Sequence, residues 1–229
     1  MNPNIQRLIQ AKREWHCQVS PEEEAKGFRG WHSRGYLPHF DAPGLRQFLT
    51  WRLADSLPAS RRSEWEHLLQ IEDERQKQIE LEAYLDKGHG SCLLRLEDVA
   101  QAVERTFLFD DGLRCRLLAW VIMPNHVHLL VEMWQTPLSK LLHSWKILTS
   151  QRANALLGRM GQLWQEDYRD RYIRDQEHYR KAICYIENNP VKARLARRAE
   201  EWRFSSAWWR EHGKRASHYI GARMPTSAL

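Results

Sequence analysis

The chain has 229 residues, enough for one domain with additions or for two small domains. Its hydrophobic content of 42% and charged content of 28% are ordinary for a soluble globular protein. The longest apolar run, Leu117 to Met123, is far below the roughly 20 residues that span a bilayer, which excludes a membrane protein. The N-terminus has no apolar segment typical of a signal peptide, so we expect a cytoplasmic protein.

The net charge indicates the class of binding partner, and the cysteines indicate the redox compartment. A net charge of +6 suggests a polyanionic partner. The four cysteines are scattered and form no C-x-x-C pair, which argues against a structural zinc and for a reducing compartment.

The N-terminal half predicts an arm, a strand and two helices. Glycines and prolines interrupt residues 1–44, which we interpret as a loop or arm. Residues 45–54 alternate in polarity and predict a strand. Residues 60–85 predict one heavily charged helix, whose positions 61–82 hold seven acidic and four basic residues. A loop at 87–91 precedes an amphipathic helix at 97–109.

The C-terminal half predicts three strands and two helices. Strands at 114–123 and 126–133 are joined by the turn Pro124-Asn125, and a long helix follows at 138–157. Residues 163–173 predict another strand. Asp175 is the expected N-cap of a helix that Pro190 ends. Residues 199–229 form an aromatic and basic tail, whose tryptophans we expect to pack against the sheet rather than to bind bases.

Without the charged helix, the order is strand, helix, strand, strand, helix, strand, followed by one more helix. This order predicts an α+β, ferredoxin-like fold: an antiparallel sheet with helices on one face, an inserted charged helix and a C-terminal tyrosine-bearing helix. We expect the second face of the sheet to be free for a ligand. The predicted domain is 45–198, preceded by an arm at 1–44 and followed by the tail.

The strand at 126–133 carries two histidines one residue apart. Because side chains alternate along a strand, His126 and His128 share one face, while Val127, Leu129 and Val131 point to the core. Two imidazoles so placed can hold one metal ion. The alternative is a pair of partly exposed histidines that bind no metal.

The helix after Asp175 carries a tyrosine in a basic segment. Tyr179, Ala182, Ile183 and Ile186 form an apolar stripe, and Tyr185 lies outside it with Asn189 one turn later. Residues 169–198 hold nine basic and four acidic residues. Lys181, one turn before Tyr185, is a candidate to lower the pKa of its phenol. The alternative is a tyrosine that only caps the surface.

Together these motifs resemble the HUH single-tyrosine transposases of bacterial insertion sequences, and more narrowly the REP-associated tyrosine transposases. The resemblance covers roughly residues 45–210. It rests on Met123-Pro124 before His126-Val127-His128, on the run from Tyr179 to Tyr185, on Asn188-Asn189-Pro190-Val191-Lys192, on Trp164-Gln165 and on Trp202-Arg203-Phe204-Ser205-Ser206.

The resemblance implies a role for each matched residue. Tyr185 would be the nucleophile, and His126, His128 and Asn189 would hold a divalent ion, Mg²⁺ or Mn²⁺. Many relatives have Gln where Asn189 stands. The implied activity is a sequence- and hairpin-specific single-stranded DNA endonuclease and strand transferase that forms a 5′-phosphotyrosine, acting in DNA transposition or in mobilisation of repeated extragenic palindromes.

The implied partner is DNA in a bacterial cytoplasm, with the protein associated with the nucleoid when bound. Relatives include dimers and monomers, so both states stay open. The candidate phosphate ligands are basic side chains of the tyrosine segment: Arg169, Arg171, Arg174, Arg180, Lys181 and Lys192.

Three other functions remain open. A protein of the same fold could bind DNA hairpins without cutting them. A metal-dependent phosphoesterase for small molecules would explain the two histidines but not the basic helix. A replication-initiator nickase would share the chemistry.

Overall fold

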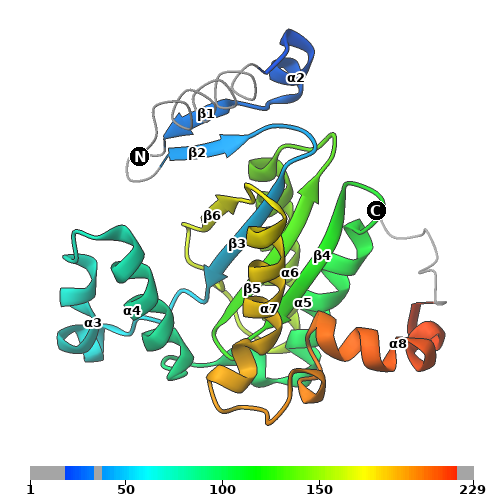
Figure 1. Ribbon diagram of the computed structural model, residues 1–229. Coiled ribbons are helices and arrows are strands. Elements are labelled where there is room, and N and C mark those ends of the chain that lie inside the picture. Colours follow the sequence, from blue (N-terminus) through cyan, green and yellow to red (C-terminus); the bar gives the residue numbers. More distant parts are fainter. Residues whose placement is uncertain (1–18, 34–37, 221–229) are drawn as a thin grey trace.

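The computed structural model describes residues 19–33 and 38–220 and centres on a four-stranded antiparallel sheet (Figure 1). Its strands are β3 (Arg46–Arg52), β4 (Cys115–Ile122), β5 (His126–Met133) and β6 (Arg169–Tyr172), in the spatial order β4-β5-β3-β6. Helices α5 (Glu97–Asp110) and α6 (Leu138–Leu156) make the two crossovers. This is the ferredoxin-like order, so the predicted fold class is confirmed.

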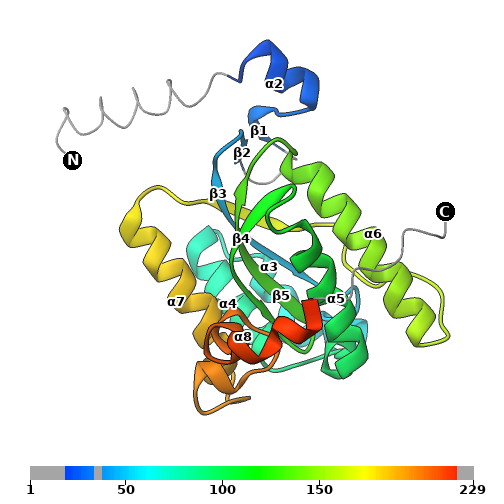
Figure 2. The ribbon, with the colours of Figure 1, turned by 90° about the vertical axis from the view of Figure 1, so that its right-hand side faces the viewer.

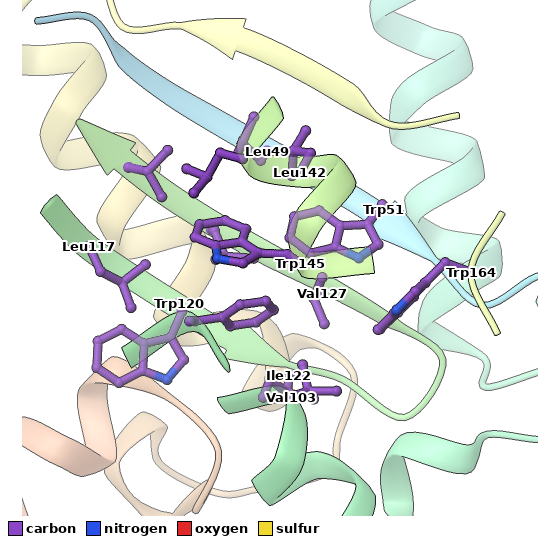
Figure 3. Close-up of a cluster of buried hydrophobic side chains, with 14 of the residues drawn as sticks. Leu49, Trp51, Val103, Leu117, Trp120, Ile122, Val127, Leu142, Trp145 and Trp164 are labelled. Carbon is purple, nitrogen blue, oxygen red and sulfur yellow. The ribbon is translucent and has the colours of Figure 1, made fainter. Parts of the chain in front are cut away.

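The core lies between one face of this sheet and helices α5 and α6. Val127, Leu129 and Val131 of β5 point into it, as their alternation predicts. Figure 3 shows Trp51, Trp145 and other large side chains filling the space between these layers. Several of the chain's tryptophans are therefore core residues.

The second face of the sheet is covered by α7 (Gln176–Lys192), as the view in Figure 2 shows. Ala182 and Ile186 of α7 are buried against Phe48 and Leu130, which point away from the first core. The apolar stripe of the tyrosine helix is thus confirmed. The expectation of a free second face is wrong, because this stripe needs an apolar surface to cover it and the sheet supplies one.

The start of α7 agrees with the sequence prediction, and its end does not. Asp175 is the N-cap, since its side chain accepts a hydrogen bond from the backbone N–H of His178. Pro190 does not end the helix, which runs on to Lys192. A proline in the last turn removes one N–H bond, and Ala193 still donates its N–H to the carbonyl of Asn189.

The charged segment forms two helices rather than the predicted single one. After a short 3₁₀ turn at Ala59–Arg61, α3 covers Arg62–Leu69 and α4 covers Glu74–Asp86. The break has a local cause: the side chain of Asp73 accepts a hydrogen bond from the N–H of Gln76 and starts a new helix.

The N-terminal arm contains regular structure that the sequence did not predict. Helix α2 (Pro21–Lys26) precedes a two-stranded antiparallel sheet of β1 (Gly30–Ser33) and β2 (Pro38–Asp41). Ser20 and Glu23 form a capping box at the start of α2. These elements are too short to show a period. Residues 1–18 and 34–37 of the predicted arm lie outside the described residues.

The last predicted strand and the tail also differ from expectation. β6 is shorter than the predicted 163–173, and Trp164 forms an isolated bridge to Leu53 instead. A 3₁₀ turn at Leu93–Arg95 precedes α5, and another at Ala199–Glu201 precedes helix α8, which covers Ser206–Ile220. Trp202 donates to the carbonyl of Ile122 and Trp209 to Glu104, so the predicted packing of these tail tryptophans is confirmed.

The remaining helices and strands follow the sequence closely, with ends that agree within about two residues for β3, α5, β4, β5 and α6. Over the part of the chain that the structure describes, no helix has the length and apolar character needed to cross a bilayer.

Candidate active site

The two histidines of β5 lie under α7, on the face opposite the first core. His126 and His128 are 1% and 0% exposed, and the centroids of their rings are 4.8 Å apart. The alternation of β5 therefore places both imidazoles together, as predicted, but it buries them. The alternative of partly exposed histidines is wrong in that respect.

Hydrogen bonds to the Nδ1 atoms fix the orientation of both rings. The amide of Asn125 donates to the carbonyls of Leu85 and His89, so its Oδ1 is left to accept from His126 Nδ1, 2.8 Å away. Thr50 Oγ1 lies 2.7 Å from His128 Nδ1. The proton on Nδ1 of His126 leaves its Nε2 lone pair available to a ligand, and His128 offers its own Nε2 lone pair in the tautomer whose Nδ1–H donates to Thr50.

Burial keeps both imidazoles neutral at physiological pH. Loss of hydration lowers the pKa of His128 to about 3, and nearby Lys192 adds to the effect. Burial also holds the pKa of His126 well below its ordinary value, with further contributions from the neighbouring His128 and Arg52. A neutral imidazole is the form that binds a metal ion.

Asn189 lies on α7 one turn after Tyr185, and its side chain is close enough to the Tyr185 hydroxyl to lower the pKa of that group. It is buried, and neither Oδ1 nor Nδ2 has a partner at hydrogen-bond distance within the described residues. The same holds for Nε2 of His126 and of His128. Buried polar atoms are rarely left without a partner, so these atoms are candidate ligands for a cation. No group of three or more His, Cys, Asp or Glu with metal-ligand geometry occurs in residues 19–33 and 38–220, which makes the amide essential to this set.

Tyr185 lies beside this group, half-buried, rather than on an open surface. The centroid of its ring is 5.5 Å from that of His128 and 5.8 Å from that of Phe48. The Nζ atom of Lys192 is 5.7 Å from the ring centroid. Tyr185 thus lies beside His128, and Asn189 follows Tyr185 one turn later on the same helix.

The hydroxyl of Tyr185 donates a hydrogen bond to Glu82 Oε2 of α4, at 2.5 Å. Burial and the negative charge of Glu82 raise the pKa of Tyr185 well above its ordinary value. The expected lowering by Lys181 is wrong. Lys181 is exposed on α7 and forms an ion pair with Glu177, at 2.6 Å.

A cavity of about 810 Å³ opens next to Tyr185, and its charged lining comprises four basic residues and the acids Glu82, Asp175 and Glu177. Phe48 and Tyr185 form part of its wall. Four of the six predicted phosphate ligands also line it: Arg169, Arg171, Arg174 and Lys181. Arg180 is exposed on α7 outside this lining, and Lys192 pairs with Asp86 at 3.2 Å.

Four polar residues near the site are not evident from the sequence motifs. Asn125 and Thr50 orient the histidines, and Glu82 and Asp86 come from the charged insert. The sequence indicates Asn125 only as a turn residue, although its position next to His126 is a usable signal. The acids of α4 gave none, because nothing local in the sequence relates residue 82 to residue 185.

Residues 91–189 match the protein-family model described as "Transposase IS200 like". This match confirms the predicted resemblance, and its segment contains His126, His128, Tyr185 and Asn189. No curated relative matches the sequence.

Among solved structures, the chain is similar to a REP-associated tyrosine transposase bound to a REP hairpin. The TM-score is 0.44 at 18% identity, over 83% of this chain and 87% of that one. It is also similar to a candidate transposase from Deinococcus radiodurans R1. There the TM-score is 0.33 at 19% identity, over 69% of this chain and 96% of the other.

Proposed function

We propose that the chain, whose residues 91–189 match the family model for IS200-like transposases, is a metal-dependent DNA endonuclease and strand transferase that uses Tyr185 as its nucleophile. The observation that carries the proposal is one tyrosine beside a pair of buried histidines with unpartnered Nε2 atoms, in the wall of a cavity that four basic side chains also line.

His126 and His128 through Nε2, and Asn189 through Oδ1, would hold the metal. Two imidazoles and one amide oxygen suit Mn²⁺, and they leave positions for water and phosphate oxygens that Mg²⁺ prefers. A bound ion would polarise the scissile phosphate and neutralise charge that develops on its oxygens.

The reaction exchanges one phosphate ester for another. Tyr185 Oη loses its proton and attacks phosphorus, so that an O–P bond to the tyrosine forms. The bond from phosphorus to the 3′ oxygen breaks, which leaves a 5′-phosphotyrosine and, after protonation, a free 3′-OH. Because the two esters are similar in energy, the step needs no ATP, and a second 3′-OH can reverse it to join strands.

The cavity next to Tyr185 suits a single strand of DNA. Arg169, Arg171, Arg174 and Lys181 would contact phosphates, and Phe48 offers a ring against which an unpaired base can stack. Arg180 and Lys192 are further candidates for phosphate contact. An imperfect hairpin of the repeated extragenic type is the proposed substrate, cut in the single strand beside its stem.

Within this proposal, residues 45–198 form the catalytic domain, flanked by the arm at 1–44 and the tail at 199–229. The protein would act on chromosomal DNA in the bacterial cytoplasm. It would work as a monomer or a homodimer.

The test is a denaturing gel of protein mixed with a 5′-tailed hairpin DNA, in Mn²⁺ or in EDTA. We expect a covalent protein–DNA band in Mn²⁺ that EDTA and Tyr185→Phe both abolish. Tyr179→Phe is the matched control, because Tyr179 lies on the same helix but packs below Arg46, away from the histidines. Its adduct should form normally.

A second candidate function is hairpin binding without cutting. The specific observation in its favour is the hydroxyl of Tyr185, which is bonded to a carboxylate and has a raised pKa. A non-cutting binder would retard the hairpin in a native gel and leave it intact in Mn²⁺, whereas the transposase would form the adduct.

A further inference from the structure

The charged insert contributes a helix to the site. Figures 1 and 2 show α4 beside α7. Two acids one helical turn apart, Glu82 and Asp86, face α7: Glu82 contacts Tyr185, and Asp86 contacts Lys192. The end of α4 is held in place by Asn125, whose amide donates to the carbonyl of Leu85. The same residue thus positions α4 and His126.

Glu82 is arranged as an acceptor. Its side chain is 9% exposed, and its two oxygens are both used: Oε2 accepts from Tyr185, and Oε1 accepts from the amide of Gln78. The hydrogen bond from Tyr185 points at Oε2, which is therefore placed to receive the proton of the hydroxyl.

A tyrosine nucleophile needs such an acceptor. A phenol that is buried and close to a carboxylate stays protonated at neutral pH. Attack then requires that its proton leave as the new bond forms. Of the described side chains, Glu82 is the one whose carboxylate receives the hydroxyl hydrogen of Tyr185.

We propose that Glu82 is the general base of the strand-cutting reaction and accepts the proton of Tyr185 as its oxygen attacks phosphorus. This inference rests on the proposed function. The Oη–H bond breaks, the proton moves to Glu82 Oε2, the Oη–P bond forms and the bond from phosphorus to the 3′ oxygen breaks. In the reverse step Glu82 returns the proton to Tyr185.

A competing role for Glu82 predicts the opposite effect of its removal on the rate of cutting. If Glu82 only holds Tyr185 in an inactive state and repels phosphate, its removal should speed cutting. If Glu82 is the base, its removal should slow cutting by about 10²–10⁴-fold, the usual contribution of general-base catalysis.

The experiment measures the rate of adduct formation in a single turnover for wild type, Glu82→Gln and Glu82→Asp. Glu80→Gln is the control, because Glu80 lies on the same helix and bonds only to Gln76 in the described contacts. We expect Glu82→Gln to be at least about 10²-fold slower with unchanged hairpin affinity, and Glu82→Asp to recover part of the rate. Circular dichroism checks that each variant is folded.

The pH profile gives a readout that a structural role would not move. In Glu82→Gln the remaining rate should rise between about pH 7 and 9, because only solvent then removes the proton; the wild-type rate should rise less. The other charged or ionisable groups near the Tyr185 ring are Asp86 of α4, Lys192 of α7, His128 of β5 and, across the cavity, Arg169, Arg171, Arg174 and Lys181.

A wild-type rate in Glu82→Gln, or a faster one, overturns the assignment of Glu82 while the wild-type adduct still supports the proposed function. Absence of an adduct in wild type overturns the proposed function itself.

Discussion

Asn125 joins the orientation of a histidine to the position of a helix, and its removal should affect both metal affinity and stability. In Asn125→Ala, the carbonyls of Leu85 and His89 lose their donor and His126 Nδ1 loses its acceptor. At roughly 1 kcal/mol for each buried group left without a partner, the free energy of unfolding should fall by about 3 kcal/mol. Removal of the group that orients a ligating histidine typically weakens metal binding by about 10- to 100-fold.

Urea unfolding and calorimetric Mn²⁺ titration measure the two effects separately. Asn125→Asp keeps an acceptor for His126 but loses both amide donors, so it should retain more affinity for Mn²⁺ than Asn125→Ala without regaining stability. Asn188→Ala is the matched control, because Asn188 is exposed and bonds only within its own helix. Wild-type affinity for Mn²⁺ in Asn125→Ala would refute the reasoning.

Three further predictions follow from burial and backbone geometry. Burial raises the pKa of the Cys115 thiol to about 12 and also raises the pKa of Cys92, so both thiols stay protonated and unreactive at about pH 8. Peptide mapping after treatment with iodoacetamide should show label on Cys184, which is exposed. Cys92 and Cys115 should be labelled only after unfolding. Gly90→Ala should lower the free energy of unfolding by about 1–3 kcal/mol, since Gly90 has φ +86° and a Cβ there would lie 2.4 Å from the carbonyl oxygen of Asp55. Gly112→Ala, where φ is +78° and the surrounding space is open, should lower it less. Urea unfolding measures both changes. Trp145→Ala should lower the free energy of unfolding by about 3–5 kcal/mol, because Trp145 is fully buried beside Trp51 and Phe107, while alanine at exposed Leu156 should change it little.

Local patterns were sufficient where one element decides the outcome. The alternation of β5 placed His126 and His128 on one face, and the spacing of α7 placed Tyr185 one turn before Asn189. The order of elements then specified the sheet, since two helical crossovers and one hairpin are compatible with few topologies.

Patterns failed where a second element decides the outcome. The burial of His126 and His128 depends on α7 covering the sheet, which no residue of β5 reveals. The contact between Glu82 and Tyr185 joins residues more than a hundred positions apart. The break between α3 and α4 turns on one capping carboxylate, that of Asp73, in a segment whose charge pattern is helical throughout.

The strict alternation of β5 has a consequence for how the chain tolerates insertions. Val127, Leu129 and Val131 belong to the apolar core on one face of this strand, and His126 and His128 lie on the other face, in the proposed active site. A slip of one residue against β3 would drive His126 and His128 into the core and turn Val127 and Leu129 toward Tyr185. An inserted or deleted residue in the Pro124-Asn125 turn should therefore abolish both folding and activity. The same change in β1 or β2, which form a separate sheet, should leave the pairing of β5 with β3 unchanged.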